Sequence, residues 1–214
     1  MVVLETVLPV ASSTPVIERA DLKTLDDTNA VQAFLNLAAS SGKIAYFDHG
    51  AYLISNTVTV PINVHITGEI LSIIMATGAV FGDQNNPKPM FQVGQPGQSG
   101  TVEMSDLVFE TKGSAPGAII VEWNIACTGP GTCGMWDVHW RIGGSAGTQL
   151  QQDTCLKNPL QTTTAADTVP CQGAFLLLHV TSQANIYMEN TWGWVADHEL
   201  DMGTRDQVDI YNGR

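Results

Sequence analysis

Positively charged side chains are scarce in this sequence. Lysine and arginine together number 9, against 21 aspartates and glutamates, so the formal net charge is −12. A chain this acidic repels phosphate backbones and anionic lipid headgroups, so we expect no nucleic acid and no membrane surface as a partner. Long hydrophobic runs are missing as well. No segment reaches the roughly 18 apolar residues that a membrane-spanning helix needs, which argues against a transmembrane protein.

The spacings typical of metal and nucleotide sites are also missing. No two cysteines stand two to four residues apart, as they do in zinc sites. His49, His65 and His179 lie in or beside apolar segments, where histidines are more often structural than ligands. The glycine-rich stretches "GQPGQSG" and "GGSAG" do not join a strand to a phosphate-facing helix. We therefore expect no metal and no cofactor.

The four cysteines lie in a region rich in glycine, proline and threonine. Their spacing favours two local disulfides, Cys127–Cys133 and Cys155–Cys171, over the alternative of free thiols. Disulfides indicate an oxidising compartment, so we expect a secreted, extracellular protein. The first residues, "MVVLETVLPVASSTP", lack the basic region of a signal peptide, and Glu5 interrupts their apolar run. We therefore expect an export signal outside this chain, as in a fragment.

One helix is predicted, near the start of the chain. Residues 1–20 are broken by prolines and favour an extended segment, whereas "DDTNAVQAFLNLAASSGK" places apolar residues at helical spacing over about 27–41. Asp27 or Thr28 is expected to cap its first turn, and Gly42 to end it. The remainder of residues 21–214 is then expected to form one incomplete all-β domain.

Short β-type segments follow from Lys43 onward, punctuated by Gly, Pro, Asn and Asp. They exclude βαβ alternation and leave a sandwich, a barrel or a parallel β-helix. Alternation in "VEWNI" and "MWDVHWRI" places an apolar row on one face and a polar row on the other. In the second segment the apolar row is Trp136, Val138 and Trp140, and the polar row is Asp137, His139 and Arg141. Stacked coils of a β-helix favour such rows, and the helix would cover the open end.

The sequence then resembles known families. "DDTNAVQAFLNLAASSGKIAYFDHGAYLISNTVTVP" looks like the start of a pectate-lyase-like right-handed parallel β-helix. "GAIIVEWNI", "GMWDVHWRIGGSAGTQLQ", "AFLLLHVT" and "YMENTWGWVADHELD" resemble, in order, fungal exo-β-1,3-glucanases of glycoside hydrolase family 55. The resemblance covers about residues 26–214.

This resemblance implies a function and a larger assembly. Members of that family are secreted, contain two β-helix domains side by side, and release glucose from β-1,3-glucan with inversion. The chain is similar to part of the second domain, so a partner β-helix domain is expected to pack against it. The family's proton donor is implied to lie in further coils beyond Arg214.

The stretch Tyr187–Asp201 holds the candidate catalytic residues. Inverting hydrolysis needs two carboxyl groups, and the candidates are Glu189, Asp197, Glu199 and Asp201. A supporting role for these carboxylates is favoured over a direct catalytic one. Trp192 and Trp194 share a strand face, where core or inter-domain packing competes with sugar stacking.

Asp137, His139 and Arg141 are further substrate-binding candidates. A surface ladder, or a face covered by the partner domain, is favoured for them over substrate contact, and Glu122 and Asn124 are expected to extend the same ladder. Two other functions remain open for the whole chain. One is a noncatalytic β-helix module, either glucan-binding or structural. The other is a polysaccharide lyase, which the acidic charge disfavours.

Overall fold

The computed structural model describes residues 26–144, 148–150, 155, 164 and 169–195. Within this part of the chain there are one α-helix, two 3-10 helices and thirteen strands. The segment 1–20 lies outside it. The bounds are α1 Thr28–Ser41, β1 Ile44–Phe47, β2 Ala51–Ile54, β3 Val58–Val60, β4 Val64–Ala76, η1 Ala79–Phe81, β5 Lys88–Val93, β6 Ser99–Gly100, β7 Val102–Thr111, β8 Ala118–Trp123, β9 Ala126–Cys127, β10 Gly134–Ile142, η2 Val169–Cys171, β11 Leu176–Val180, β12 Tyr187–Glu189 and β13 Trp192–Val195.

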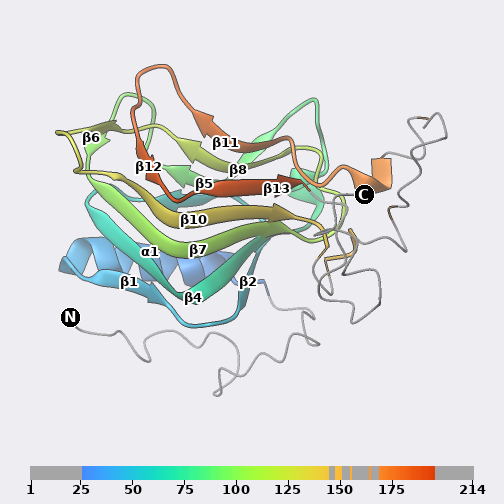
Figure 1. Ribbon diagram of the computed structural model, residues 1–214, viewed down its shortest axis with the longest axis horizontal. Helices are drawn as coiled ribbons and strands as arrows, with labels where there is room; N and C mark the ends of the chain where they lie inside the picture. Colours follow the sequence, from blue (N-terminus) through green and yellow to red (C-terminus); the bar gives the residue numbers. More distant parts are fainter. Residues whose placement is uncertain (1–25, 145–147, 151–154, 156–163, 165–168, 196–214) are drawn as a thin grey trace.

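All strand pairs among the described residues are parallel, and they form three sheets (Figure 1). Sheet A runs β1-β4-β7-β10-β12, with β2 beside β4 and β13 beside β10. Sheet B runs β11-β8-β5-β3, and sheet C pairs β6 with β9. From β4 to β9 the chain visits sheets A, B and C in turn, twice, and then continues through β10 of sheet A and β11 of sheet B to β12 and β13 of sheet A. Each strand therefore pairs with a strand one turn earlier in the chain. The predicted all-β class with one helix agrees with this arrangement.

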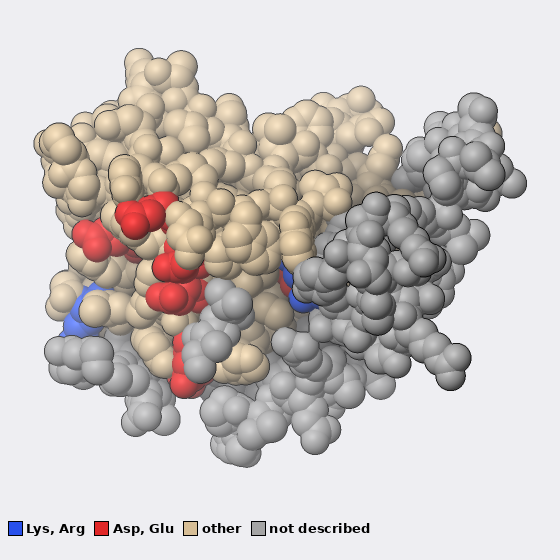
Figure 2. All heavy atoms as spheres, in the orientation of Figure 1, with Lys and Arg blue, Asp and Glu red and all other residues tan. Residues whose placement is uncertain are grey.

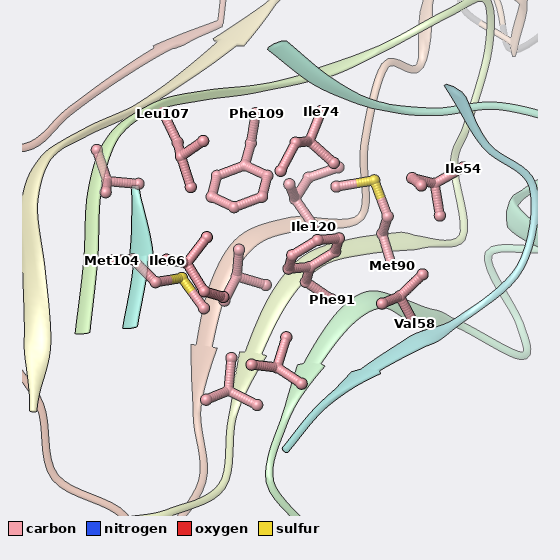
Figure 3. Close-up of a cluster of buried hydrophobic side chains, with 14 of the residues drawn as sticks. Ile54, Val58, Ile66, Ile74, Met90, Phe91, Met104, Leu107, Phe109 and Ile120 are labelled. Carbon is pink, nitrogen blue, oxygen red and sulfur yellow. The ribbon is translucent and has the colours of Figure 1, made fainter. Parts of the chain in front are cut away.

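The core lies between sheets A and B, where inward side chains of successive passes stack in register (Figure 3). Ile66 of β4, Met104 of β7 and Met135 of β10 occupy matched positions, and each is at most 2% exposed. Phe91 of β5 packs edge-on against Phe109 of β7, with ring centroids 5.4 Å apart. Each such side chain stabilises the fold by roughly 1.5–3 kcal/mol relative to its exposure to water.

Helix α1 buries one apolar face, as predicted, and its C-terminal Gly42 adopts a left-handed conformation with φ 62°. Asp27 occupies the N-cap position, as expected, but its side chain makes no hydrogen bond that caps the helix. The Asp26 carboxylate, and not Asp27 or Thr28, accepts a hydrogen bond from the backbone N–H of Thr28, at 3.0 Å. Asp27 is the neighbouring carboxylate, but it turns to strand β2 and accepts the backbone N–H of Leu53 at 2.9 Å. Adjacent aspartates thus divide the two tasks between them.

The same helix lies against the first strand of sheet B. The Gln32 side-chain amide donates to the Thr59 carbonyl and accepts the Thr59 N–H, both at 2.8 Å. These bonds occupy backbone groups of β3 that would otherwise form an open sheet edge. Figure 1 shows α1 lying alongside β1 at this end of the stack. The helix therefore covers one end of the strand stack, as expected.

Two disulfides close short loops, one just before β10 and one between β10 and β11. They join Cys127 to Cys133 and Cys155 to Cys171, which is the expected pairing. In the described part of the chain, no helix is both long enough and apolar enough to cross a bilayer.

Sheet A carries a line of kinks that changes which side chains face outward. Asp106 of β7, Asp137 of β10 and the following Asn190 have positive φ angles of 57°, 54° and 51°. The Asn190 amide also donates to the Asp137 carboxylate. Trp136 precedes this kink and is only half-buried, while Met135 and Val138 are fully buried. The expectation that Trp136 shares a face with Val138 and Trp140 is therefore wrong, because the kink interrupts the two-residue alternation.

Candidate functional site

Five rings line the outer surface of the last strands of sheet A. We call them the outer aromatic face: Trp136 and His139 of β10, Tyr187 of β12, and Trp192 and Trp194 of β13. The parallel register brings them together, since Trp192 pairs with His139 and Glu189 with Trp136. An outward aromatic row is unusual for strands whose opposite side fills the core, so it marks a candidate contact surface.

Three of these rings form a continuous cluster. His139 and Trp192 are stacked, with centroids 4.2 Å apart and planes at 13°, and Trp194 follows at 5.1 Å from Trp192. Trp192 and Trp194 remain 38% and 39% exposed. Gly193 between them faces inward, where a Cβ would lie 2.8 Å from Leu177. Core packing, one of the roles expected for the two tryptophans, is therefore wrong, because the register directs both to the outside. Inter-domain packing, the other expected role, stays a prediction.

His139 is the most enclosed member of the cluster. Its side chain lies under Trp192, the residue is 6% exposed, and its Nδ1 has no hydrogen-bond partner among the described residues. Burial lowers the pKa of His139, against the opposing charges of Asp137 and Asp106. The neutral imidazole is therefore favoured at neutral pH. An unpaired buried nitrogen costs about 1–3 kcal/mol.

Carboxylates surround the aromatic rings. Figure 2 shows aspartate and glutamate atoms gathered on this side of the molecule. Glu189 accepts a hydrogen bond from the Tyr187 hydroxyl at 2.8 Å. That bond and the Glu189 charge raise the pKa of Tyr187. Asp137 sits at the kink, bound by Asn190. The face therefore offers hydrogen-bond acceptors beside flat apolar rings.

The structure thus brings most of the candidate residues to one place. Asp137, His139, Arg141, Glu189, Trp192 and Trp194 all lie on or beside β10, β12 and β13. Arg141 is half-buried and in register with Trp194. Asp197, Glu199 and Asp201 lie outside the described residues, so no distance between candidate acids and bases follows. Sequence patterns missed Trp136 and Tyr187, because the first was assigned to the core and the second was not considered.

Sheet B carries a different outer row. Thr59, Gln92, Glu122 and His179 occupy matched positions on β3, β5, β8 and β11, and we call them the sheet B polar row. Glu122 accepts hydrogen bonds from Gln92 at 3.2 Å and Asn124 at 3.1 Å, and lies 3.2 Å from His179 Nδ1. Burial opposes its ionisation, but these three contacts together lower the pKa of Glu122.

The expected ladder joining Glu122 and Asn124 to Asp137 is therefore wrong, because Glu122 belongs to the other sheet. Asn124 is fully buried, not on a polar face, and its Nδ2 also donates to the Gly94 carbonyl at 3.2 Å. An asparagine just past a strand end can turn inward to satisfy a backbone carbonyl, and alternation alone does not reveal this.

A hollow of about 320 Å³ lies beside the Cys155–Cys171 disulfide. Ile142, Phe175, Leu177 and Val195 supply apolar walls, and its lining contains no titratable side chain among the described residues. It therefore offers no acid or base. Within the described ranges there is also no group of three histidines, cysteines, aspartates or glutamates placed to hold a metal ion.

Together these features define a class of site. Exposed aromatic rings provide flat apolar surfaces, and the carboxylates between them repel anions while accepting hydrogen bonds from hydroxyl groups. That combination suits a neutral, hydroxyl-rich ligand such as a sugar.

Similarity to known proteins points the same way. A protein of Arthroderma benhamiae named "Probable glucan endo-1,3-beta-glucosidase" is 58% identical over 196 residues, covering 92% of this chain. A Cochliobolus carbonum protein named "Glucan 1,3-beta-glucosidase" is 46% identical over 191 residues, covering 88% of this chain. The chain spans only 22% and 23% of the length of these two relatives.

A third relative has a different name. The "Non-secreted LysM effector LysM15" of Penicillium expansum is 39% identical over 191 residues, which is 89% of this chain and 13% of that protein. No protein-family profile matches the chain. The segment thus resembles parts of longer fungal proteins, and two of the three relatives described above carry glucan glucosidase names.

Proposed function

We propose that this chain is part of a secreted glycoside hydrolase of the glycoside hydrolase family 55 type, acting on β-1,3-glucan. The observation that carries the proposal is the outer aromatic face on an acidic sheet, which suits a neutral polysaccharide. The two relatives with glucan glucosidase names support the same substrate. In this proposal the stacked parallel strands belong to a right-handed, pectate-lyase-like parallel β-helix, comprising residues 21–214, that packs against a second such domain.

The proposed reaction releases glucose from a chain end with inversion. Such hydrolysis needs an acid that protonates the leaving oxygen and a base that activates water, with carboxyls about 6.5–9.5 Å apart. Glu189 is exposed and accepts a hydrogen bond from Tyr187, unlike the apolar surroundings that keep a catalytic acid protonated. We therefore assign Glu189 to binding sugar hydroxyls, and place the proton donor outside the described residues.

Trp192 and Trp194 are proposed to stack on sugar rings, with His139 holding Trp192 in place from below. Trp192→Ala removes the ring that His139 stacks against, at a centroid distance of 4.2 Å. An aromatic pair contributes about 0.5–1.5 kcal/mol beyond its buried area, and we take a sugar ring stacked on an indole to contribute a similar amount. The variant should therefore weaken glucan binding several-fold.

The test is glucose release from laminarin by the full-length gene product. We expect release by the wild-type protein and a several-fold higher KM for Trp192→Ala. Tyr46→Ala is the matched control, because Tyr46 lies on the distant strand β1 of the same sheet, and this variant should behave as wild type. The absence of any release from laminarin would refute the hydrolase assignment.

A noncatalytic glucan-binding module is the second candidate. The observation that favours it is the similarity to a protein named as a LysM effector and not as a hydrolase. Binding of the full-length gene product to insoluble β-1,3-glucan, with no sugar released, would support this candidate over the enzyme.

A further inference from the structure

Trp136 and Tyr187 form a second aromatic pair at the other end of the outer aromatic face. Their ring centroids lie 5.8 Å apart and their planes are tilted by 40°. Tyr187 is 50% exposed and Trp136 is half-buried. Gly134 makes this packing possible, because a Cβ at that position would lie 2.5 Å from the Tyr187 carbonyl oxygen and 3.1 Å from the tip of the Trp136 ring. A side chain at 134 would displace the indole from its place against the sheet.

Polar groups beside this pair match the needs of a sugar. Glu189 lies in register with Trp136 and receives the Tyr187 hydroxyl through one of its oxygens, Oε2. Its second oxygen, Oε1, has no hydrogen-bond partner among the described residues, so it can accept a bond from a ligand hydroxyl. Glu103 on β7, in register with Gly134, adds a second carboxylate. These charges repel anionic ligands and leave neutral hydroxyl groups as suitable partners.

The two aromatic clusters are too far apart for a single sugar ring. Trp136 and His139 are three residues apart on β10, which corresponds to about 10 Å along a strand. Between them lie the kink residues Asp137 and Asn190, which are hydrogen-bonded to each other. A ligand that contacts both clusters must therefore be an extended chain. Asp137 and Asn190 would then face the sugar units in the middle of that chain.

We propose that Trp136 and Tyr187 form a distal binding site for β-1,3-glucan, so that the outer aromatic face holds several consecutive sugar units along β10, β12 and β13. The inference rests on the proposed function for the identity of the sugar. It adds that the face recognises a chain and not a single terminal unit. Trp192 and Trp194 bind one part of the chain, and Trp136 and Tyr187 bind a more distant part.

Sugars of different length can distinguish binding at the two clusters. The full-length gene product is titrated calorimetrically with laminaribiose and with laminarihexaose, in the wild type and in the variants Trp136→Ala and Tyr187→Ala. We expect each variant to bind the hexaose roughly tenfold more weakly, which corresponds to the loss of one aromatic contact. Binding of the biose at the Trp192 cluster should be unchanged. If the protein hydrolyses the hexaose, the initial-rate KM replaces the dissociation constant.

Matched variants keep the result interpretable. Tyr46→Ala removes an aromatic ring from the same outer row, three strands and about 14 Å from Trp136, and should change neither affinity. Tyr187→Ala removes a half-exposed ring, so it provides the same test if Trp136→Ala does not fold. Unchanged hexaose binding in the folded variants, or an equal loss for both sugars, would overturn the distal site. A wild-type protein that binds neither sugar would instead contradict the proposed function.

Discussion

The outer surfaces of the two sheets are built from the same repeating backbone but carry different side chains. Sheet B carries a row of polar side chains in contact with one another, and the last strands of sheet A carry exposed aromatic rings. On sheet B, the polar row links Gln92, Glu122 and His179 by side-chain contacts of 3.2 Å, with Asn124 adding another to Glu122. On sheet A, the last strands present rings with 38–50% exposure at Tyr187, Trp192 and Trp194. Polar contacts between strands occur on both sheets, and on sheet A His65 lies 3.1 Å from Glu103. The last strands of sheet A differ because they also leave aromatic rings exposed.

The difference separates structure from function. A row whose members satisfy one another gains stability from each contact and has little left to offer a ligand. The outer aromatic face instead contains exposed rings and a carboxylate oxygen of Glu189 that has no partner among the described residues. Exposed rings and unpaired polar atoms do not stabilise the fold. We therefore attribute their presence on this face to ligand binding.

The largest expected effect contrasts two tryptophans. Trp123 of β8 is fully buried and donates its indole N–H to the Asn185 carbonyl at 3.0 Å. Trp123→Ala should lower the free energy of unfolding by about 3–5 kcal/mol, as for other buried aromatic truncations. Trp192→Ala should lower it by about 1 kcal/mol or less, because that ring is already exposed. Chemical denaturation followed by circular dichroism measures both. Similar losses for the two variants would mean that Trp192 is a core residue after all.

A second comparison concerns Glu122. Glu122→Ala leaves Gln92 and His179 without their shared acceptor, and should cost about 2 kcal/mol in the free energy of unfolding. Glu122→Gln keeps the shape and one acceptor oxygen, so it should cost less. Neither variant should alter glucan binding, because the residue lies on sheet B. If a Glu122 variant changed the glucan affinity and left the stability unchanged, the glucan would bind on sheet B and not on the outer aromatic face of sheet A.

Much of this architecture could be predicted from the sequence. The apolar spacing of Val31, Leu35 and Ala38 identified the helix, and the short punctuated segments identified stacked strands. The local cysteine spacing identified both disulfides. These features depend on contacts close in sequence, or on patterns that repeat along the chain, and such features are visible without coordinates of any partner strand.

The facing of individual side chains could not be predicted in the same way. The positive φ at Asp137 interrupts the alternation of inward and outward side chains along β10. An aspartate in the sequence does not by itself predict a positive φ. "WGWV" correctly placed Trp192 and Trp194 on one face, but only the register with β10 decided that this face is outside. Trp136 was therefore assigned to the core, and the aromatic pair with Tyr187 was missed.

The pH dependence of stability should differ between the two faces. Burial lowers the pKa of His139, so its contribution is complete above the ordinary value of 6.5 and is lost as the pH falls through the folded pKa. The lowered pKa of Glu122 gives stability above its ordinary value of 4.5, which is lost at still lower pH. In thermal unfolding measured across pH, His139→Gln should remove only the first loss and Glu122→Gln only the second. If both variants removed the same loss of stability, the two pH-dependent losses would not belong to separate residues, and the prediction would be wrong.

The smallest expected effect tests the kink that sets the outer aromatic face apart. Asp106 has a φ of 57°, next to the equivalent kink at Asp137. A left-handed backbone costs a non-glycine residue about 1–2 kcal/mol. Within the described part of the chain, the Asp106 side chain makes no hydrogen bond that its removal would break. Asp106→Gly should therefore leave the free energy of unfolding unchanged or raise it by up to about 1 kcal/mol, because glycine removes this strain. Asp106→Val should lower it by about 1–2 kcal/mol, since a β-branched side chain resists the same angle. Equal stability of the two variants would show that the kink does not constrain sheet A, and that the facing of β10 is set by packing alone.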